Sequence, residues 1–322
     1  MPIVELRDLK KYYPIKGGFF RRTIAQLKAV DGVSFSIEPS TTFGLVGESG
    51  CGKSTLGRTV LGLHEATDGQ VLFDGKDITH EKGADWISQR RQMQIIFQDP
   101  YGSLNPRFTV REIIREPLDT HNIGDAHSRN ERVHELLSVV GLRPAVIDRY
   151  PHEFSGGQRQ RVGIARALAL NPRFIVADEP VSALDVSVQS QVLNLIKDLQ
   201  DQFGIAFLFI SHDLAVVQHI SHEVGVMYFG KLVERAPSLE LYENPKHPYT
   251  QSLISAVPQP DPENKSQHQI LEGDIPNHRN PPQGCPFHPR CPVAKPECKT
   301  EKPILKNLGT EEKPHHIACH LY

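Results

Sequence analysis

The residues with the most specific chemistry lie at positions 47–55, which read GESGCGKST and follow the apolar run TFGLV. They fit the phosphate-binding pattern of Gly, four residues, Gly, Lys and then Ser or Thr. The glycines would let the backbone point its N–H groups at phosphate oxygens, and the start of the following helix would add partial positive charge. Lys53 would neutralise the β- and γ-phosphates of a nucleotide, and the Ser54 hydroxyl would ligate Mg²⁺.

The ATP contacts predicted from this pattern form one continuous run. They are Gly47, Glu48, Ser49, Gly50, Cys51, Gly52, Lys53, Ser54 and Thr55. The alternative is a plain glycine-rich turn before a helix, which composition alone would produce in roughly one chain in a hundred of this size. The apolar run before the pattern and the expected helix after it favour the phosphate loop.

A second chemical signal is the segment RFIVADE at 173–179, where an apolar run ends in two carboxylates. Open α/β sheets place their ligands at the carboxyl ends of the strands. Asp178 would therefore hold the Mg²⁺ shell, and Glu179 would act as general base toward the attacking water. Alone, such a run is a weak signal and is more typical of a strand that enters a solvated turn. Downstream of a phosphate loop, it indicates a P-loop NTPase.

A third signal, FSGGQRQR at 154–161, opens a stretch with helical spacing of apolar residues. Ser155, Gly156, Gly157 and Gln158 would present a hydroxyl and bare N–H groups at a helix start, which is a second anion-binding surface. One nucleotide hardly needs two such surfaces from one chain. We therefore expect two subunits to pair head to tail, unless the segment is only a turn and helix cap.

The elements that must position these residues alternate between strands and helices. Alternating apolar residues predict a strand at 33–37, the run at 42–46 predicts a buried parallel strand, and residues 70–78 predict a hairpin that turns at Asp74 and Gly75. The segments REIIREPL and ERVHELLSVVGL, within 100–150, have helical spacing. The expected fold is an α/β P-loop domain with an antiparallel β region and a helical subdomain.

Composition limits the classes of partner. The 36 basic and 38 acidic residues give a net charge of −2, which provides no overall positive field for nucleic acid. The N-terminus lacks the pattern of a secretory signal, and no apolar run approaches the ~20 residues of a membrane-spanning helix. We therefore expect a cytosolic chain that does any membrane work through partners.

Composition also changes along the chain, because prolines become frequent after about residue 235. This predicts an ATPase domain at 1–235, with its helical subdomain at about 100–165, followed by a small extension at 236–322. No internal repeat is visible, so a single ATPase unit is expected.

With these motifs, the chain resembles the ATPases of ABC transporters, whose signature is LSGGQ; here Phe154 replaces the leucine. The resemblance implies that Gln98 is the Q-loop glutamine, that Ala183–Asp185 form the D-loop and that His212 is the switch histidine. The catalytic set would then be Gln98, Glu179 and His212. Gln98 would also ligate Mg²⁺, together with Ser54 and Asp178. Tyr13 takes the place of the aromatic residue that stacks on adenine, with Tyr12 as a close competitor.

Three further segments resemble the ATP-binding subunits of bacterial dipeptide and oligopeptide importers: FQDPYGSLNPR at 97–107, DEPVSALDVSVQSQVLNL at 178–195 and NPKHPYTQSL at 244–253. This resemblance implies a second, paralogous ATPase subunit, two membrane permeases, a periplasmic peptide-binding protein, and a peripheral location on the cytoplasmic face of the bacterial inner membrane. Tyr101, Leu104 and Phe108 would then contact a permease helix or, as readily, pack within the helical subdomain.

Other functions remain open on the sequence alone. The cargo could be nickel, haem, an antimicrobial peptide or a glycoside instead. A soluble ABC ATPase that acts on ribosomes or DNA usually has two ATPase units or a coiled-coil insertion, and a purely regulatory subunit would not need Glu179 and His212.

The extension contains four of the five cysteines, Cys285, Cys291, Cys298 and Cys319. In a reducing cytosol, clustered thiols indicate a metal site before they indicate disulfides. Their spacing lacks the short CxxC pairs of zinc sites and favours a [4Fe–4S] cluster. Two alternatives are free thiols and a zinc site completed by one or more of His288, His315, His316 and His320. Because these cysteines are far along the chain from the phosphate loop, we expect Cys291→Ser to leave ATP binding largely intact.

Overall fold

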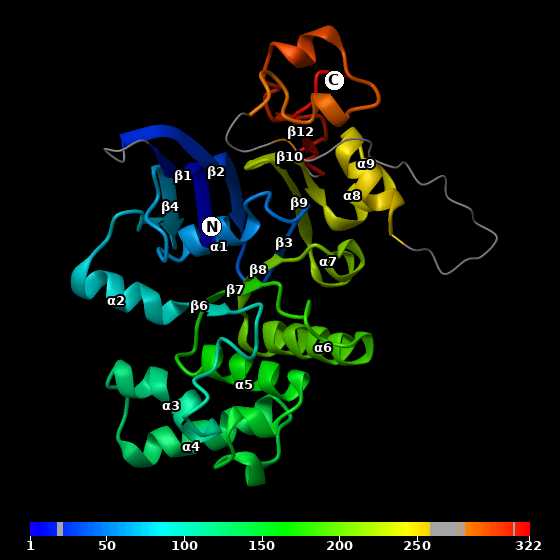
Figure 1. Ribbon diagram of the computed structural model, residues 1–322. Coiled ribbons are helices and arrows are strands. Elements are labelled where there is room, and N and C mark those ends of the chain that lie inside the picture. Colours follow the sequence, from blue (N-terminus) through cyan, green and yellow to red (C-terminus); the bar gives the residue numbers. More distant parts are fainter. Residues whose placement is uncertain (18–21, 258–275, 277–280, 312) are drawn as a thin grey trace, which may run out of the picture. The chain divides into compact units, whose positions relative to one another are not determined.

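The computed structural model describes residues 1–17, 22–257, 276, 281–311 and 313–322 (Figure 1). Their contacts define two compact units. The first comprises Met1, 37–41 and 81–210, and the second comprises 2–36, 42–80 and 211–322. The division of the chain at residue 235 stays a prediction.

The second unit contains the antiparallel β region that the sequence predicts. Its strand order is β2 (Arg22–Ile37), β1 (Val4–Gly17), β4 (Asp68–Phe73) and β5 (Lys76–Asp77). The predicted hairpin is confirmed, because β4 pairs antiparallel with β5 and Asp74 and Gly75 between them both have positive φ, 51° and 77°. Two consecutive residues with positive φ fit the tight turn of a two-residue hairpin.

The second unit also contains the strand that leads into the phosphate loop. β3 (Thr42–Val46) is fully buried and pairs in parallel with β9 (Glu223–Tyr228), which continues antiparallel into β10 (Lys231–Pro237). The extension adds β12 (His316–Ile317) to β10 and β11 (Lys306–Asn307) to β12. The unit's helical elements are α1 (Lys53–Val60), α7 (Leu214–Ile220), α8 (Ser238–Glu243), α9 (Pro248–Ser255), η3 (His288–Arg290) and η4 (Pro296–Lys299).

A buried carboxylate fastens the extension to β10. Glu234 has no exposed surface and accepts hydrogen bonds from the backbone N–H groups of Lys246 and His247, at 2.7 and 2.9 Å. Its Oε1 also lies 2.7 Å from Nε2 of His315, which precedes β12. Removing one partner from such a buried set costs about 3–5 kcal/mol. The tail is therefore part of the packed second unit.

The first unit contains three parallel strands, β6 (Met93–Ile96), β7 (Phe174–Asp178) and β8 (Ala206–Ile210). Its helical elements are α2 (Gly83–Gln92), α3 (Val110–Thr120), α4 (Ala126–Val139), η1 (Pro144–Val146), η2 (Pro151–Glu153), α5 (Gly156–Leu168) and α6 (Val186–Phe203). Helices α3, α4 and α5 pack on one another and form the predicted helical region. Capping boxes at Thr109 and Asp125 fix where α3 and α4 begin.

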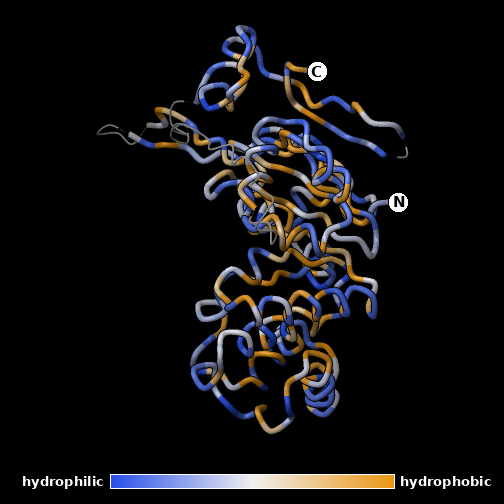
Figure 2. The backbone as a smooth tube through the Cα atoms, turned by 90° about the vertical axis from the view of Figure 1, so that its right-hand side faces the viewer, coloured by the Kyte–Doolittle hydropathy of each residue, from blue (hydrophilic) through white to orange (hydrophobic). Residues whose placement is uncertain are grey.

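Hydrophobic and hydrophilic stretches alternate along the described chain (Figure 2). In the described residues, each helix is too short or too polar to cross a bilayer.

Candidate functional site

The phosphate loop requires glycine at two of its positions for lack of space. Gly47 and Gly52 have φ values of 150° and 109°, and a Cβ would lie 2.1 Å from the Met227 carbonyl oxygen at Gly47 and 2.0 Å from that of Ala29 at Gly52. Any side chain would collide with backbone that cannot move aside. The glycines that the pattern requires are thus fixed by the neighbouring β2 and β9 strands.

The Lys53 side chain lies inside this loop. Lys53 is 5% exposed, and its Nζ donates to the carbonyl oxygens of Gly47, at 2.6 Å, and Glu48, at 3.1 Å. Helix α1 begins at Lys53 with Gly52 as its N-cap, so Ser54 and Thr55 lie on its first turn. The loop therefore combines a fixed ammonium group with a helix N-terminus, the combination that binds anions.

Glu48 has partners that the sequence does not predict. Its backbone N–H donates to the Tyr249 hydroxyl at 2.9 Å, and its carboxylate forms a two-pronged ion pair with Arg290 at 2.7 and 2.9 Å. Both partners belong to the extension. The cysteine region, although far along the chain, therefore contacts the phosphate loop through Arg290, which directly precedes Cys291, and the expectation that Cys291→Ser leaves ATP binding largely intact stays a prediction. No local pattern reveals a contact between residues 242 positions apart.

His212 lies beside the strand that leads to the phosphate loop. The N–H of Ser211 donates to the Leu45 carbonyl of β3 at 3.1 Å, so His212 leaves the backbone next to that strand's end. Asp213 then caps α7 by accepting from Ala215. The exposed His212 side chain thus lies near the carboxyl end of β3, and its role as the switch histidine stays a prediction.

The two candidate adenine-stacking tyrosines differ in their contacts. The Tyr12 hydroxyl donates a hydrogen bond to the partly buried Asp31 carboxylate, and this bond holds Tyr12 in the second unit. The Tyr13 ring is half-buried and meets His64 edge to face, with centroids 6.0 Å apart. The contacts favour Tyr13, whose role stays a prediction.

In the first unit, two predicted catalytic residues meet. Gln98 Nε2 donates to Glu179 Oε2 at 3.0 Å. Glu179 follows the buried Asp178 at the end of β7 and has a φ of 48°, a left-handed conformation that costs a non-glycine residue about 1–3 kcal/mol. The bond from Glu179 N–H to the Ile210 carbonyl, 2.9 Å, holds it there. Such strain is concentrated at functional sites.

The signature segment forms a helix cap. Ser155 Oγ accepts from Gln158 N–H at 3.4 Å, and the Gln158 side chain accepts from Ser155 N–H at 3.1 Å. The hydroxyl hydrogen of Ser155 can still be donated to an anion. Gly157 also has a packing role, because a Cβ there would lie 2.3 Å from Val188 of α6. That helix begins after its N-cap Asp185, the residue predicted for the D-loop.

The predicted site residues are thus divided between the two units. The second unit contains the phosphate loop, Tyr13 and His212, and the first contains Gln98, Asp178, Glu179, the signature and Asp185. That these residues come together around one nucleotide stays a prediction.

The four C-terminal cysteines are free thiols, and Cys285 and Cys298 are buried. Burial, with further contributions from Cys298, Cys319 and Cys291, raises the pKa of Cys285 to about 11. The described residues nevertheless contain no group of three or more His, Cys, Asp or Glu arranged to hold a metal ion. Of the histidines that could complete a zinc site, His315 is bound to Glu234, His288 lies against the Cys285 carbonyl, and His320 against that of Glu301.

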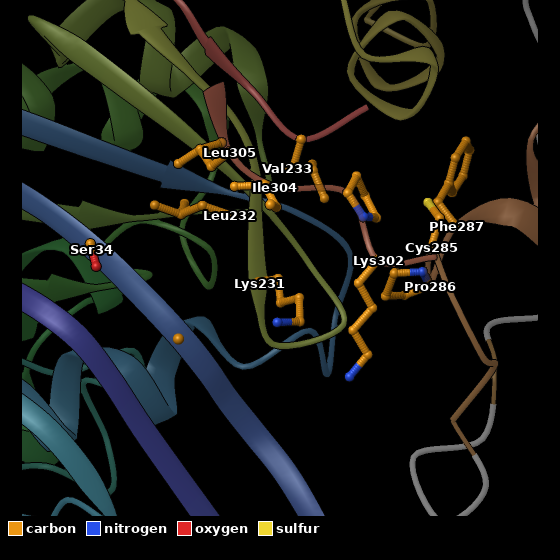
Figure 3. Close-up of a pocket in the computed structure, with 13 residues that line it drawn as sticks. Ser34, Lys231, Leu232, Val233, Cys285, Pro286, Phe287, Lys302, Ile304 and Leu305 are labelled. Atoms are coloured by element: carbon orange, nitrogen blue, oxygen red, sulfur yellow. The ribbon is translucent and has the colours of Figure 1, made fainter. Parts of the chain in front are cut away.

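A separate cavity of about 380 Å³ lies in the second unit. Figure 3 shows apolar residues of β10 and Ile304 on one side and Cys285 to Phe287 on the other. Residues of the phosphate loop do not line it, so this cavity is distinct from the predicted ATP site.

Models of two known protein families match the two regions of the chain. A model of the ABC transporter family matches residues 30–182, and a model of the oligopeptide/dipeptide transporter C-terminal region matches residues 233–298. The chain is 57% identical to the oligopeptide transport ATP-binding protein AppF of Bacillus subtilis, covering 99% of this chain and 97% of that protein. It is 52% identical to a putative peptide import ATP-binding protein of Brucella ovis, covering 99% and 97%.

A solved structure shares the fold. The ATP-binding cassette MJ0796, a dimer in a post-hydrolysis state bound to ADP and Pi, has a TM-score of 0.65 and 28% sequence identity, covering 73% of this chain and 98% of that one.

Proposed function

The chain belongs to the family of ABC transporter ATP-binding proteins, and from this premise we propose that its ATP hydrolysis powers the uptake of dipeptides or oligopeptides. The observation that carries the cargo assignment is the match of residues 233–298 to the peptide-transporter C-terminal region, together with relatives named for peptide import along nearly the whole chain.

We assign the hydrolytic roles as follows. Lys53 and the loop N–H groups bind the β- and γ-phosphates, and Tyr13 stacks on adenine. Ser54, Asp178 and Gln98 would hold Mg²⁺, which neutralises charge on the phosphates. Glu179 accepts a proton from the attacking water, and His212 contacts the γ-phosphate. The left-handed backbone of Glu179 and its bond to Gln98 support this assignment.

The signature is assigned to a partner's nucleotide. Ser155, Gly156, Gly157 and Gln158 would close over the ATP bound by a second ATPase subunit, and Asp185 would lie at that contact. The dimeric state of the MJ0796 cassette is a precedent in a protein of the same fold.

The membrane partners are proposed to be two permeases, supplied with peptide by a periplasmic binding protein, with this chain peripheral on the cytoplasmic face. Leu104 is only 3% exposed and packs inside the helical region, whereas Tyr101 and Phe108 are 65% and 38% exposed and can contact a permease. Arg159 lies 3.7 Å from the Tyr101 ring and fixes its direction.

Purification of the tagged chain from its native membrane tests this assembly. We expect two hydrophobic permeases and a second ATPase to be recovered with it, at equal amounts. Recovery with ribosomes and without permeases would overturn the assignment.

For the four cysteines we propose a [4Fe–4S] cluster, with zinc as the alternative. The support is four unpaired thiols whose charges affect one another. Because the described thiols are not arranged as a metal group, binding would have to draw them together.

Anaerobic purification followed by iron, sulfide and zinc analysis decides this point. We expect about four iron and four sulfide per chain, lost in Cys291→Ser. A colourless protein with one zinc and no sulfide would exclude the cluster, and absence of all three would leave free thiols.

A further inference from the structure

Three side chains of the extension, Tyr249, Phe287 and Arg290, form what we call the loop clamp, because they hold the phosphate loop at Glu48. Tyr249 comes from α9 and Arg290 from η3, and Phe287 anchors η3. The Phe287 ring is 1% exposed and packs against Tyr249 and Tyr228, with centroids 5.4 and 5.3 Å apart. The clamp is therefore a fixed part of the second unit.

The charge of Glu48 gives the clamp its importance. Glu48 is the one acidic residue in the loop at 47–55. An uncompensated carboxylate in a loop that binds a nucleoside triphosphate would repel the phosphates. The Arg290 side chain, 6% exposed, covers this carboxylate with two hydrogen bonds of 2.7 and 2.9 Å. A bidentate pair fixes direction as well as charge.

The backbone of Glu48 is held at the same time. Its N–H is committed to the Tyr249 hydroxyl and its carbonyl to Lys53 Nζ. Glu48 is thus fixed through its N–H, its carbonyl and its side chain, two of these by the extension. The Glu48 ion pair also keeps the pKa of the Arg290 guanidinium above its usual range, so its charge persists at any physiological pH.

We propose that Arg290 is a positioning residue for ATP binding: it neutralises Glu48 and thereby makes the phosphate loop receptive to the triphosphate. The extension is by this contact a component of the nucleotide site. The inference rests on the proposed assignment of residues 47–55 as the ATP loop.

The test is a double-mutant cycle on the full-length chain, with Mg-ATP and Mg-ADP as probes. We expect Arg290→Met to weaken ATP binding about tenfold, or about 1.4 kcal/mol, and ADP binding less, because ADP carries less charge. Glu48→Gln should tighten ATP binding a few-fold, since the positive charge of Arg290 beside the loop is then uncompensated. The double variant Glu48→Gln/Arg290→Met should bind ATP within about twofold of the native chain, and Arg290→Lys should bind between the native and Met variants.

The matched control is a second bidentate pair, Arg235 with Glu223, at 2.5 and 3.1 Å. Glu223 pairs with Phe43 at the start of β3, away from the strand end that enters the loop. Arg235→Met should therefore leave ATP affinity unchanged even if it lowers the thermal midpoint.

Three results would overturn the inference. They are unchanged ATP affinity in a folded Arg290→Met chain, loss of affinity that Glu48→Gln does not restore, and equal losses for ATP and ADP. If Arg290→Met does not fold, Glu48→Gln alone decides, because weaker or unchanged ATP binding contradicts the charge argument. Lys53→Ala distinguishes failure of the loop assignment from failure of the loop clamp. If Lys53→Ala leaves ATP binding intact, the loop assignment fails. If Lys53→Ala lowers ATP affinity but the Arg290 variants do not change it, the loop clamp fails.

Discussion

Lys53→Ala is expected to abolish measurable ATP binding by the purified chain. Lys53 is 5% exposed, and its ammonium nitrogen lies 2.6 Å from the Gly47 carbonyl oxygen, so its charge is fixed inside the loop. Losing a charge-assisted contact to the β- and γ-phosphates in a site of this kind weakens binding by about 100-fold or more. Fluorescent ATP titration measures the effect directly.

The control for that variant is Lys231→Ala, which removes a partly buried lysine of β10 that pairs with Asp31. It should retain native ATP affinity. Native affinity in a folded Lys53→Ala chain would mean that ATP binds elsewhere.

Glu179→Gln is expected to retain ATP binding and to slow hydrolysis by about 100-fold or more, the scale for loss of a positioned general base. The amide keeps the shape of the side chain and can still meet Gln98, so the fold should survive. ATP should also hold the paired subunits closed, because the nucleotide is no longer cleaved. Phosphate release and size-exclusion chromatography with ATP measure the two effects.

Glu131→Gln is the matched control, since the Glu131 side chain is 69% exposed on α4 and pairs with the exposed His127. Its turnover should equal that of the native chain. Near-native turnover of Glu179→Gln in the assembled transporter would show that another group activates the water.

Local sequence patterns predicted the strands, turns and helices that have a regular spacing of apolar residues or a characteristic turn sequence. The run at 42–46 is the buried strand β3, and Asp74 and Gly75 make the hairpin turn. The helical spacing at 111–118 falls in α3, and that at 131–142 falls in α4 up to Val139 and continues past the end of the helix. Glycine was predictable at positions 47 and 52 because the φ values and the lack of space there impose one residue type.

Contacts between distant segments were not predictable in the same way. Nothing near Glu48 indicates Arg290, and nothing near Glu234 indicates that His315 returns to it across 81 positions. The Gly157 contact with Val188 likewise depends on the packing of two helices. Residue spacing encodes a face of one element, whereas these pairs depend on how several elements pack. The tail therefore looked independent in sequence but is packed against the phosphate loop in the structure.

Uptake of a labelled oligopeptide by vesicles that contain the purified transporter and its binding protein tests the central claim most directly. We predict ATP-dependent uptake with the native chain, and loss of that uptake when the Glu179→Gln variant replaces it in an intact assembly. Undiminished peptide uptake with the Glu179→Gln chain, or native assemblies that hydrolyse ATP without moving peptide, would contradict it.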